Sequence, residues 1–150
     1  MLNRYRRTRA LVEEGGELAA EMALFVENEA RRAGIDVSVL DEPREELVMV
    51  RVRETAQGCE FFLGEALMTT CRVSVGACTG LGMVLGSDRH FAQNLAVIDA
   101  AFSGGMGEGL SRTWEARLRE AERGIARRRA REQARVCSTR VDFSMMEAEL

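Results

Sequence analysis

Four segments before Gly86 alternate apolar and polar residues with a period of two, as half-buried strands do. They are VSVL (37–40), ELVMVRV (46–52), EALMTTCRVSV (65–75) and TGLGMVL (79–85). Pro43 falls between the first two segments and predicts a turn there. The glycines of the last segment share one face, where another part of the chain can approach the backbone closely. Since no helical pattern separates these segments, they predict a mostly antiparallel sheet of about four strands.

Helical patterns flank the predicted sheet on both sides in the sequence. Residues 4–14 and 17–33 have helical composition and are separated by a Gly-Gly breaker. After Gly86, apolar residues recur at positions 91, 95, 98 and 102, which lie on one face of a helix. The pattern predicts an α+β fold, a mostly antiparallel sheet flanked by N-terminal and C-terminal helices. A length of 150 residues predicts a single domain over 1–150.

A long helix is expected over 110–135, after the glycine-rich linker SGGMGEG at 103–109. Its apolar stripe runs from Leu110 through Trp114 to Ile125 but fades from Arg127, where arginines become frequent. The last two turns therefore have little core of their own to bind. We expect the segment from about residue 108 to be an interaction segment, with an exposed face of Trp114 docking on a partner.

The residues that are missing narrow the possible chemistry. All 21 basic residues are arginine, so there is no lysine for a Schiff base or a Walker-type phosphate loop. His90 is the one histidine, so any nucleophilic triad would have to be built on it. The four cysteines form no CxxC pair, and no metal site built by this chain alone is expected. A self-sufficient enzyme is disfavoured, and the glycine spacing GxGxxxG at 80–86 matches the dinucleotide fingerprint poorly.

Charge is segregated along the chain although the net charge is only -3. The first ten residues are basic, residues 11–60 are rich in acids, and ERGIARRRAREQAR (122–135) is basic again. One alternative function is therefore nucleic-acid binding by the arginine-rich helix and the N-terminus. The acidic net charge and the single Trp and Tyr argue against it, because few aromatic rings are left for base stacking.

No segment predicts a membrane span or a signal peptide. The longest apolar runs fall well short of the roughly 20 residues that cross a bilayer. The basic start, MLNRYRRTR, is not followed by the apolar region of a secretory signal. We therefore expect a cytoplasmic protein that does not enter a membrane.

The turn Gly86-Ser87-Asp88-Arg89-His90 joins the last strand to a helix, and two interpretations of it stay open. Its N–H groups and Arg89 could face an anion, such as a triphosphate or a phosphonate. Alternatively, Asp88 caps the helix, and this interpretation is favoured because a carboxylate there repels an anion. His90 is either a general acid or base or, as is commoner for a lone histidine, an exposed or locally bonded residue.

Charged residues of the strands and the following helix complete the candidate set. Arg51, Arg53 and Arg72 either form a positive outer face for an acidic ligand or partner or are ordinary solvated strand residues. Asp99 is expected to pair with an arginine of the sheet or of a partner. The candidate ligand or partner contacts are therefore Arg72, Arg89, His90 and Asp99. No catalytic residue can be assigned.

Two blocks of the sequence carry distinctive motifs. The first, FFLGEALMTTCRVSVGACTGLGMVLGSDRHFAQNLAVIDAAF (61–102), contains Gly-Glu before a strand, a Thr-x-Cys-x-Val alternation, a Gly-x-Asp-Arg turn and Ile-Asp-Ala near the helix end. The second is TRVDF (139–143). Together and in this order, the two blocks resemble the PhnG family of the bacterial carbon-phosphorus lyase, and the resemblance covers roughly residues 4–145 in element order. The chain departs from the family after Asp142, where FSMMEAEL replaces a tail that commonly ends with an arginine.

The resemblance implies a role in the use of phosphonates as a phosphorus source. PhnG proteins work with PhnH-like, PhnI-like and PhnJ-like subunits and the PhnL-like protein. The step implied is displacement of adenine from MgATP by an alkylphosphonate, which gives ribose 1-alkylphosphonate 5-triphosphate. The family's nucleosidase activity is attributed to PhnI, so this chain is expected to be an accessory subunit, inactive alone. It is expected to bind no cofactor by itself, MgATP being a substrate of the complex.

Docking on those partners is expected to involve the last helix and the tail. Val141 and Phe143 give anchoring area, while Arg140 and Asp142 give register. With Trp114, the partner-docking candidates are Arg140, Asp142 and Phe143. Without partners, self-association as a homo-oligomer would cover the same apolar surface.

Overall fold

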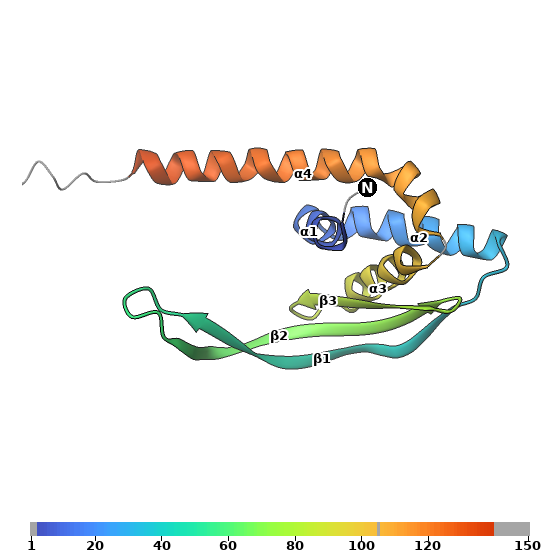
Figure 1. Ribbon diagram of the computed structural model, residues 1–150, viewed down its shortest axis with the longest axis horizontal. Coiled ribbons are helices and arrows are strands. Elements are labelled where there is room, and N and C mark those ends of the chain that lie inside the picture. Colours follow the sequence, from blue (N-terminus) through green and yellow to red (C-terminus); the bar gives the residue numbers. More distant parts are fainter. Residues whose placement is uncertain (1–2, 105, 140–150) are drawn as a thin grey trace, which may run out of the picture.

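The computed structural model describes residues 3–104 and 106–139. Its elements are α1 (Arg4–Glu14), α2 (Gly16–Arg32), β1 (Val37–Arg53), β2 (Glu60–Val75), β3 (Cys78–Leu85), α3 (Arg89–Ser103) and α4 (Gly107–Ser138). The strands form an antiparallel sheet in the order β1-β2-β3, and the helices lie on one face of it (Figure 1). The predicted α+β fold with a mostly antiparallel sheet is confirmed.

The first strand is longer than the sequence pattern indicates. Segments 37–40 and 46–52 belong to one strand, β1, so the turn predicted at Pro43 is wrong and the described sheet has three strands. The register of β1 against β2 shifts between Val39 and Asp41 and again between Asp41 and Arg44. A bulged edge strand accommodates Pro43, which has no N–H to donate, without ending the strand.

Close contact between backbones joins α3 to the sheet. A Cβ added at Gly80 or Gly82 would collide with the α3 backbone at Ala92, Ala96 or Ala100. These three alanines are spaced four residues apart on one face of α3 and are fully buried. The predicted close approach to the glycine face is thus confirmed, and the approaching element is α3.

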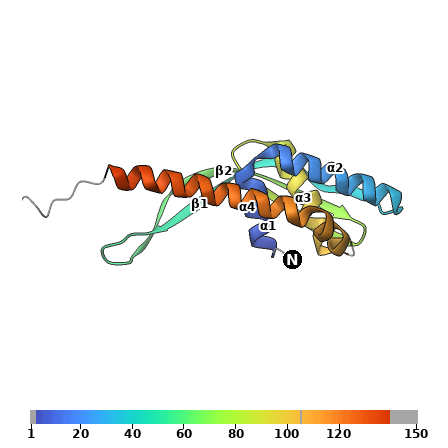
Figure 2. The same cartoon turned by 90° about the horizontal axis from the view of Figure 1, so that it is seen from above.

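Only the first part of α4 packs on the body of the molecule. Its buried residues are Gly107, Leu110, Trp114, Leu118, Ala121 and Ile125. Trp114 meets Phe25 of α2 edge to face, with ring centroids 5.7 Å apart. Every residue from Ala126 to Thr139 is exposed, so the predicted fading of the stripe is confirmed. This part of α4 projects past the other helices (Figure 2).

The sheet also extends beyond the helices. The far half of the β1–β2 hairpin projects toward the same end of the molecule as the C-terminal half of α4 (Figures 1 and 2). None of the helices in the described residues is long and apolar enough to cross a membrane.

Candidate functional site

The turn before α3 is built as a helix start. Asp88 Oδ1 accepts a hydrogen bond from the Phe91 N–H at 2.9 Å, which caps the helix. Gly86 has a φ of +92°, and its N–H donates to the Leu67 carbonyl at 2.8 Å. The Thr69 hydroxyl donates to the Gly86 carbonyl at 2.6 Å. The capping interpretation is confirmed, and these bonds hold the turn against β2.

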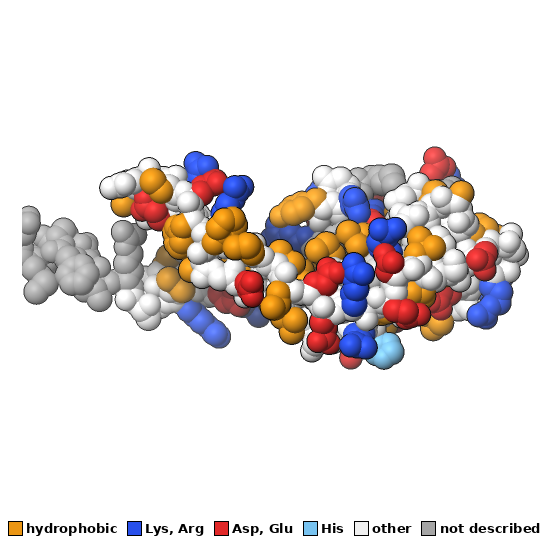
Figure 3. Space-filling view, turned by 90° about the horizontal axis from the view of Figure 1, so that it is seen from below, with side chains coloured by type: hydrophobic (Ala, Val, Ile, Leu, Met, Phe, Trp, Pro, Cys, Tyr) orange, Lys and Arg blue, Asp and Glu red, His pale blue; other side chains and the backbone are white. Residues whose placement is uncertain are grey.

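Three of the four candidate contact residues lie on the surface, in two separate places. Arg89 lies at the start of α3, with its Nε 3.7 Å from Glu45 Oε1. The His90 side chain is exposed beside it (Figure 3) and makes no hydrogen bond or ion pair within the described residues. Arg72 pairs with Asp41, its Nε 3.1 Å from Oδ2, across the β1–β2 pair. The structure therefore does not bring Arg72 together with the two residues of the turn.

Asp99 is the fourth candidate, and it is the centre of a buried ion-pair network. Arg4 donates to both of its carboxylate oxygens, at 2.8 and 2.7 Å. Arg7 Nη2 donates to Oδ1 at 3.3 Å, and the Leu81 N–H donates to Oδ2 at 3.2 Å. The expectation that Asp99 pairs with an arginine of the sheet is wrong, because α1 crosses α3 at this point and supplies both arginines. Asp99 thus links α1, α3 and β3.

Burial gives Arg7 an unusual environment for a charged group. Its guanidinium lies 4.1 Å from the centre of the Phe102 ring, and its side chain is 6% exposed. Removal from water lowers the pKa of Arg7, while the Asp99 carboxylate acts in the opposite direction. Arginine stays protonated in proteins, so this charge is compensated by Asp99 and by the ring face. The charged groups of this network are paired with one another, so the network holds α1, α3 and β3 together and has a structural role.

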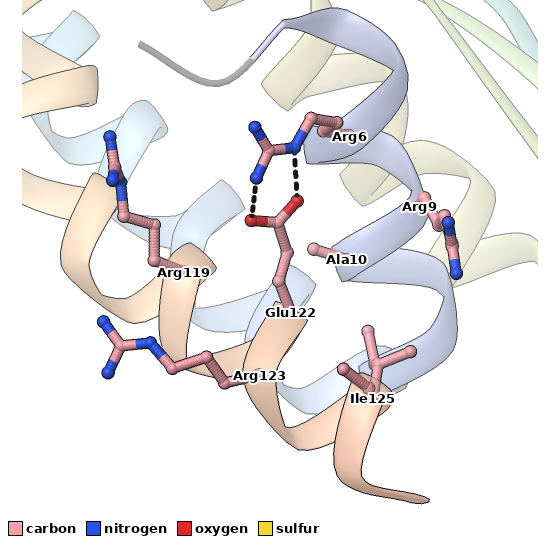
Figure 4. Close-up of a pocket in the computed structure, with 8 residues that line it drawn as sticks. Arg6, Arg9, Ala10, Arg119, Glu122, Arg123 and Ile125 are labelled. Atoms are coloured by element: carbon pink, nitrogen blue, oxygen red, sulfur yellow. Dashed lines mark hydrogen bonds and ion pairs between the residues drawn. The ribbon is translucent and has the colours of Figure 1, made fainter. Parts of the chain in front are cut away.

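A second charged cluster lies in the groove between α1 and α4 (Figure 4). The groove has a volume of about 530 Å³. Arg6 donates to both carboxylate oxygens of Glu122, at 2.8 and 2.7 Å, in a bidentate pair. Figure 4 shows Arg9 turned to the opposite side of the groove from Arg119 and Arg123. The arginines therefore do not converge on one point.

Carboxylates of the same chain neutralise these arginines. Arg9 pairs with Glu13, Arg119 with Glu115 and Arg123 with Glu120, at 2.7, 2.7 and 3.1 Å. The arginines at the start of the basic helix end are also paired. Arg127, Arg128 and Arg129 bind Glu120, Glu14 and Glu13, respectively. Three of the pairs, Arg6–Glu122, Arg128–Glu14 and Arg129–Glu13, join α1 to α4. Since carboxylates of the same chain already neutralise most of these arginines, the pairing argues against the nucleic-acid alternative.

The sequence did not identify Arg4, Arg6 and Arg7 as partners of acids in other helices. The available signal was their clustering on α1 without a local acid. Their partners Asp99 and Glu122 are separated from them by 95 and 116 residues, so spacing could not reveal the pairs.

The docking candidates have different outcomes. The expectation that Trp114 exposes a face is wrong: it is 5% exposed, because the apolar stripe of α4 packs into the core shared with the other helices, where Trp114 meets Phe25 of α2. Within the described residues its indole N–H has no hydrogen-bond partner. Replacing Trp114 would therefore report on the core of this chain. Arg140, Asp142 and Phe143 lie outside the described residues.

The described part of the chain contains no group of three or more His, Cys, Asp or Glu residues arranged to hold a metal ion. The fold and the charged clusters define a small α+β protein, with a three-stranded sheet covered by helices on one face and charged residues that join its helices.

The family follows from comparison of the sequence. A family model described as "Phosphonate metabolism protein PhnG" matches residues 3–147, and the chain belongs to this family. The chain therefore has a role in phosphonate metabolism. No curated protein matches it significantly.

Proposed function

We propose that this chain is an accessory subunit of the carbon-phosphorus lyase core complex. In this proposal it supports displacement of adenine from MgATP by an alkylphosphonate, and it is inactive alone. The observation that supports the accessory role is that the buried charged groups of the described chain are occupied in ion pairs with one another. Arg4 and Arg7 are paired with Asp99, and the side chain of His90 has no hydrogen-bond or ion-pair partner among the residues that the structure describes.

The proposed partners are the PhnI-like, PhnH-like and PhnJ-like subunits and the PhnL-like protein, in the cytoplasm. The PhnI-like subunit would carry the chemistry on MgATP. The exposed apolar residues of this chain support the proposal that it functions bound to other subunits. Within the described residues, most of the exposed large hydrophobic side chains lie on the sheet: Val39, Leu40, Leu47, Val48, Met49, Phe61, Phe62, Leu63, Leu67, Leu81, Met83 and Leu85. Patches of this kind mark protein contacts.

Reconstitution tests this function directly. The PhnI-like, PhnH-like and PhnL-like proteins of the same source are mixed with MgATP and methylphosphonate, with and without this chain, and adenine release is followed. We expect release to need the chain, and the chain alone to release none. Equal adenine release with and without the chain would refute the accessory role. Release by the chain alone would make it the catalyst.

A further inference from the structure

The far part of the β1–β2 hairpin has no core of its own. We call residues 47–67 the arm. No residue of the arm is buried, whereas β2 alternates buried and accessible positions from Thr69 onward. Seven large apolar side chains of the arm are exposed: Leu47, Val48, Met49, Phe61, Phe62, Leu63 and Leu67. A two-stranded hairpin is marginally stable by itself in water, so this arrangement needs a cover.

Both faces of the arm carry exposed apolar residues, and nearer its tip Arg51 and Arg53 pair with Glu60. Leu47 pairs with Leu67 on the face that α3 covers further along, as the buried Thr69 two residues later indicates. Val48 pairs with Ala66 on the opposite face. The run Leu-Val-Met-Val at 47–50 is the pattern of a strand buried on both sides. A flat partner surface would cover one face only, so the arm fits a cleft.

The exposed apolar area of the arm is close to what one partner contributes to a specific protein–protein interface. Half-exposed side chains of this size each leave on the order of 100 Å² accessible, so seven approach the roughly 800 Å² that one partner contributes to a standard interface. Figure 3 shows apolar side chains gathered over the hairpin and along the uncovered face of the sheet.

Charge beside the arm favours a partner of different sequence over a second copy. The projecting part of α4, residues 126–138, carries five arginines and one glutamate and lies at the same end of the molecule as the arm. Arg127, Arg128 and Arg129 are paired with carboxylates, whereas the guanidinium groups of Arg131 and Arg135 make no hydrogen bond or ion pair within the described residues. A two-fold contact of two identical chains at this end would place these arginine-rich ends near each other, at an electrostatic cost.

We infer that the arm inserts into an apolar cleft of another subunit of the proposed complex, with acidic residues at the cleft edge meeting Arg131 and Arg135. This inference rests on the proposed function, whose partners it assumes. The arm is then the docking element, and the helical layer is the body that positions it.

The test compares two substitutions at equally exposed positions of the full chain. Phe62 in the arm and Leu24 on α2 are both 60% exposed, so Phe62→Asp and Leu24→Asp add the same charge outside the core. Each tagged variant is co-expressed with the PhnI-like, PhnH-like and PhnJ-like subunits and purified, and the co-purified subunits are quantified. We expect Phe62→Asp to co-purify with at least tenfold less of the partner subunits than the unchanged chain does. Leu24→Asp should co-purify with the same amount as the unchanged chain, within twofold. Unchanged thermal unfolding of both variants shows that each is folded.

A photo-crosslinking residue at Leu47 and, separately, at Val48 tests the cleft. These neighbours point to opposite faces, and we expect both to crosslink to the same subunit. Crosslinking from one face alone would overturn the cleft. If both aspartate variants retain the partners, the arm is not the docking element, although the proposed function stands. If the unchanged chain co-purifies with none of these subunits, the proposed function is refuted, and so is the inference that one of them holds the arm. Loss of a chain–chain dimer in Phe62→Asp, measured by sedimentation, would then identify a second copy as occupant.

Discussion

Asp99 pairs with one buried arginine, Arg7, and one exposed arginine, Arg4, and this difference predicts how much each pair contributes to the stability of the chain. Asp99→Asn keeps the size of the side chain and removes its charge. The Arg7 guanidinium then stays buried beside Phe102, its side chain 6% exposed, without a counter-charge. Removing one partner of a buried ion pair costs about 3–5 kcal/mol. The amide oxygen can still accept one hydrogen bond, so we expect a loss near the lower limit, about 3 kcal/mol.

Urea unfolding of the purified chain measures this loss, with the midpoint compared at constant slope. In thermal unfolding the same change lowers the Tm of a chain of this size by about 6–12 °C. Arg4→Gln is the matched control, because it removes the other arginine that pairs with Asp99, an arginine whose side chain is 67% exposed. An exposed pair contributes about 0–1 kcal/mol, so the control should be nearly neutral.

A third variant separates the cost of an unpaired charge from simple loss of contacts. Replacing both partners, as in Asp99→Asn with Arg7→Met, removes the buried charge altogether. We expect this double variant to be more stable than Asp99→Asn alone, because an apolar side chain can replace a buried pair at little cost. The reasoning is refuted if Asp99→Asn costs no more than Arg4→Gln, or if the double variant is the least stable of the set.

Three further outcomes are expected. Gly82→Ala places a methyl group against the α3 backbone and should lower the free energy of unfolding, measured in urea, by about 2–4 kcal/mol. Gly109→Ala, in open space on α4, should leave the free energy of unfolding unchanged or raise it slightly. Equal effects of the two substitutions would contradict the close packing. Glu54 accepts the N–H groups of the hairpin turn, which lowers its pKa, so its support of the turn is present above its ordinary pKa and lost as the pH falls through the lower folded value. NMR titration of the turn amides measures this, and a midpoint at or above the ordinary value would be inconsistent with it. Burial raises the pKa of the Cys71 thiol, so alkylation near pH 8 should label the exposed Cys59 and leave Cys71 until urea unfolds the chain; mass mapping that finds Cys71 labelled first would oppose this.

Periodicity predicted the secondary structure where burial is one-sided. The alternation in 69–75 and the helical stripe after Gly86 both report which side chains meet the core, and both elements were predicted correctly. Pro43 misled the prediction, because an edge strand tolerates proline at a bulge and the local pattern does not reveal edge position. The close approach at the glycines of 80–82 was predictable, since their alternating spacing leaves one face without side chains.

The charged site was less predictable, for a physical reason. Asp99 was identified as a residue that pairs, but its partners depend on how α1 crosses α3, which no local pattern encodes. The arginines of α1 gave the same local signal as a nucleic-acid patch until their acids were located in space. Trp114 illustrates the same ambiguity, because a stripe on a helix predicts burial without saying whether the cover is α2 of this chain or a partner.

Leu81 connects the uncovered face of the sheet to the ion pairs of Asp99. Its side chain is 41% exposed on the uncovered face of the sheet, while its N–H donates to Asp99, which holds Arg4 and Arg7. A displacement of β3 by a partner pressing on that face would therefore reach the carboxylate by two routes, this hydrogen bond and the packing of α3 on Gly80 and Gly82. From Asp99 the contact continues to α1, so a partner bound on the uncovered face would be one strand away from the first helix.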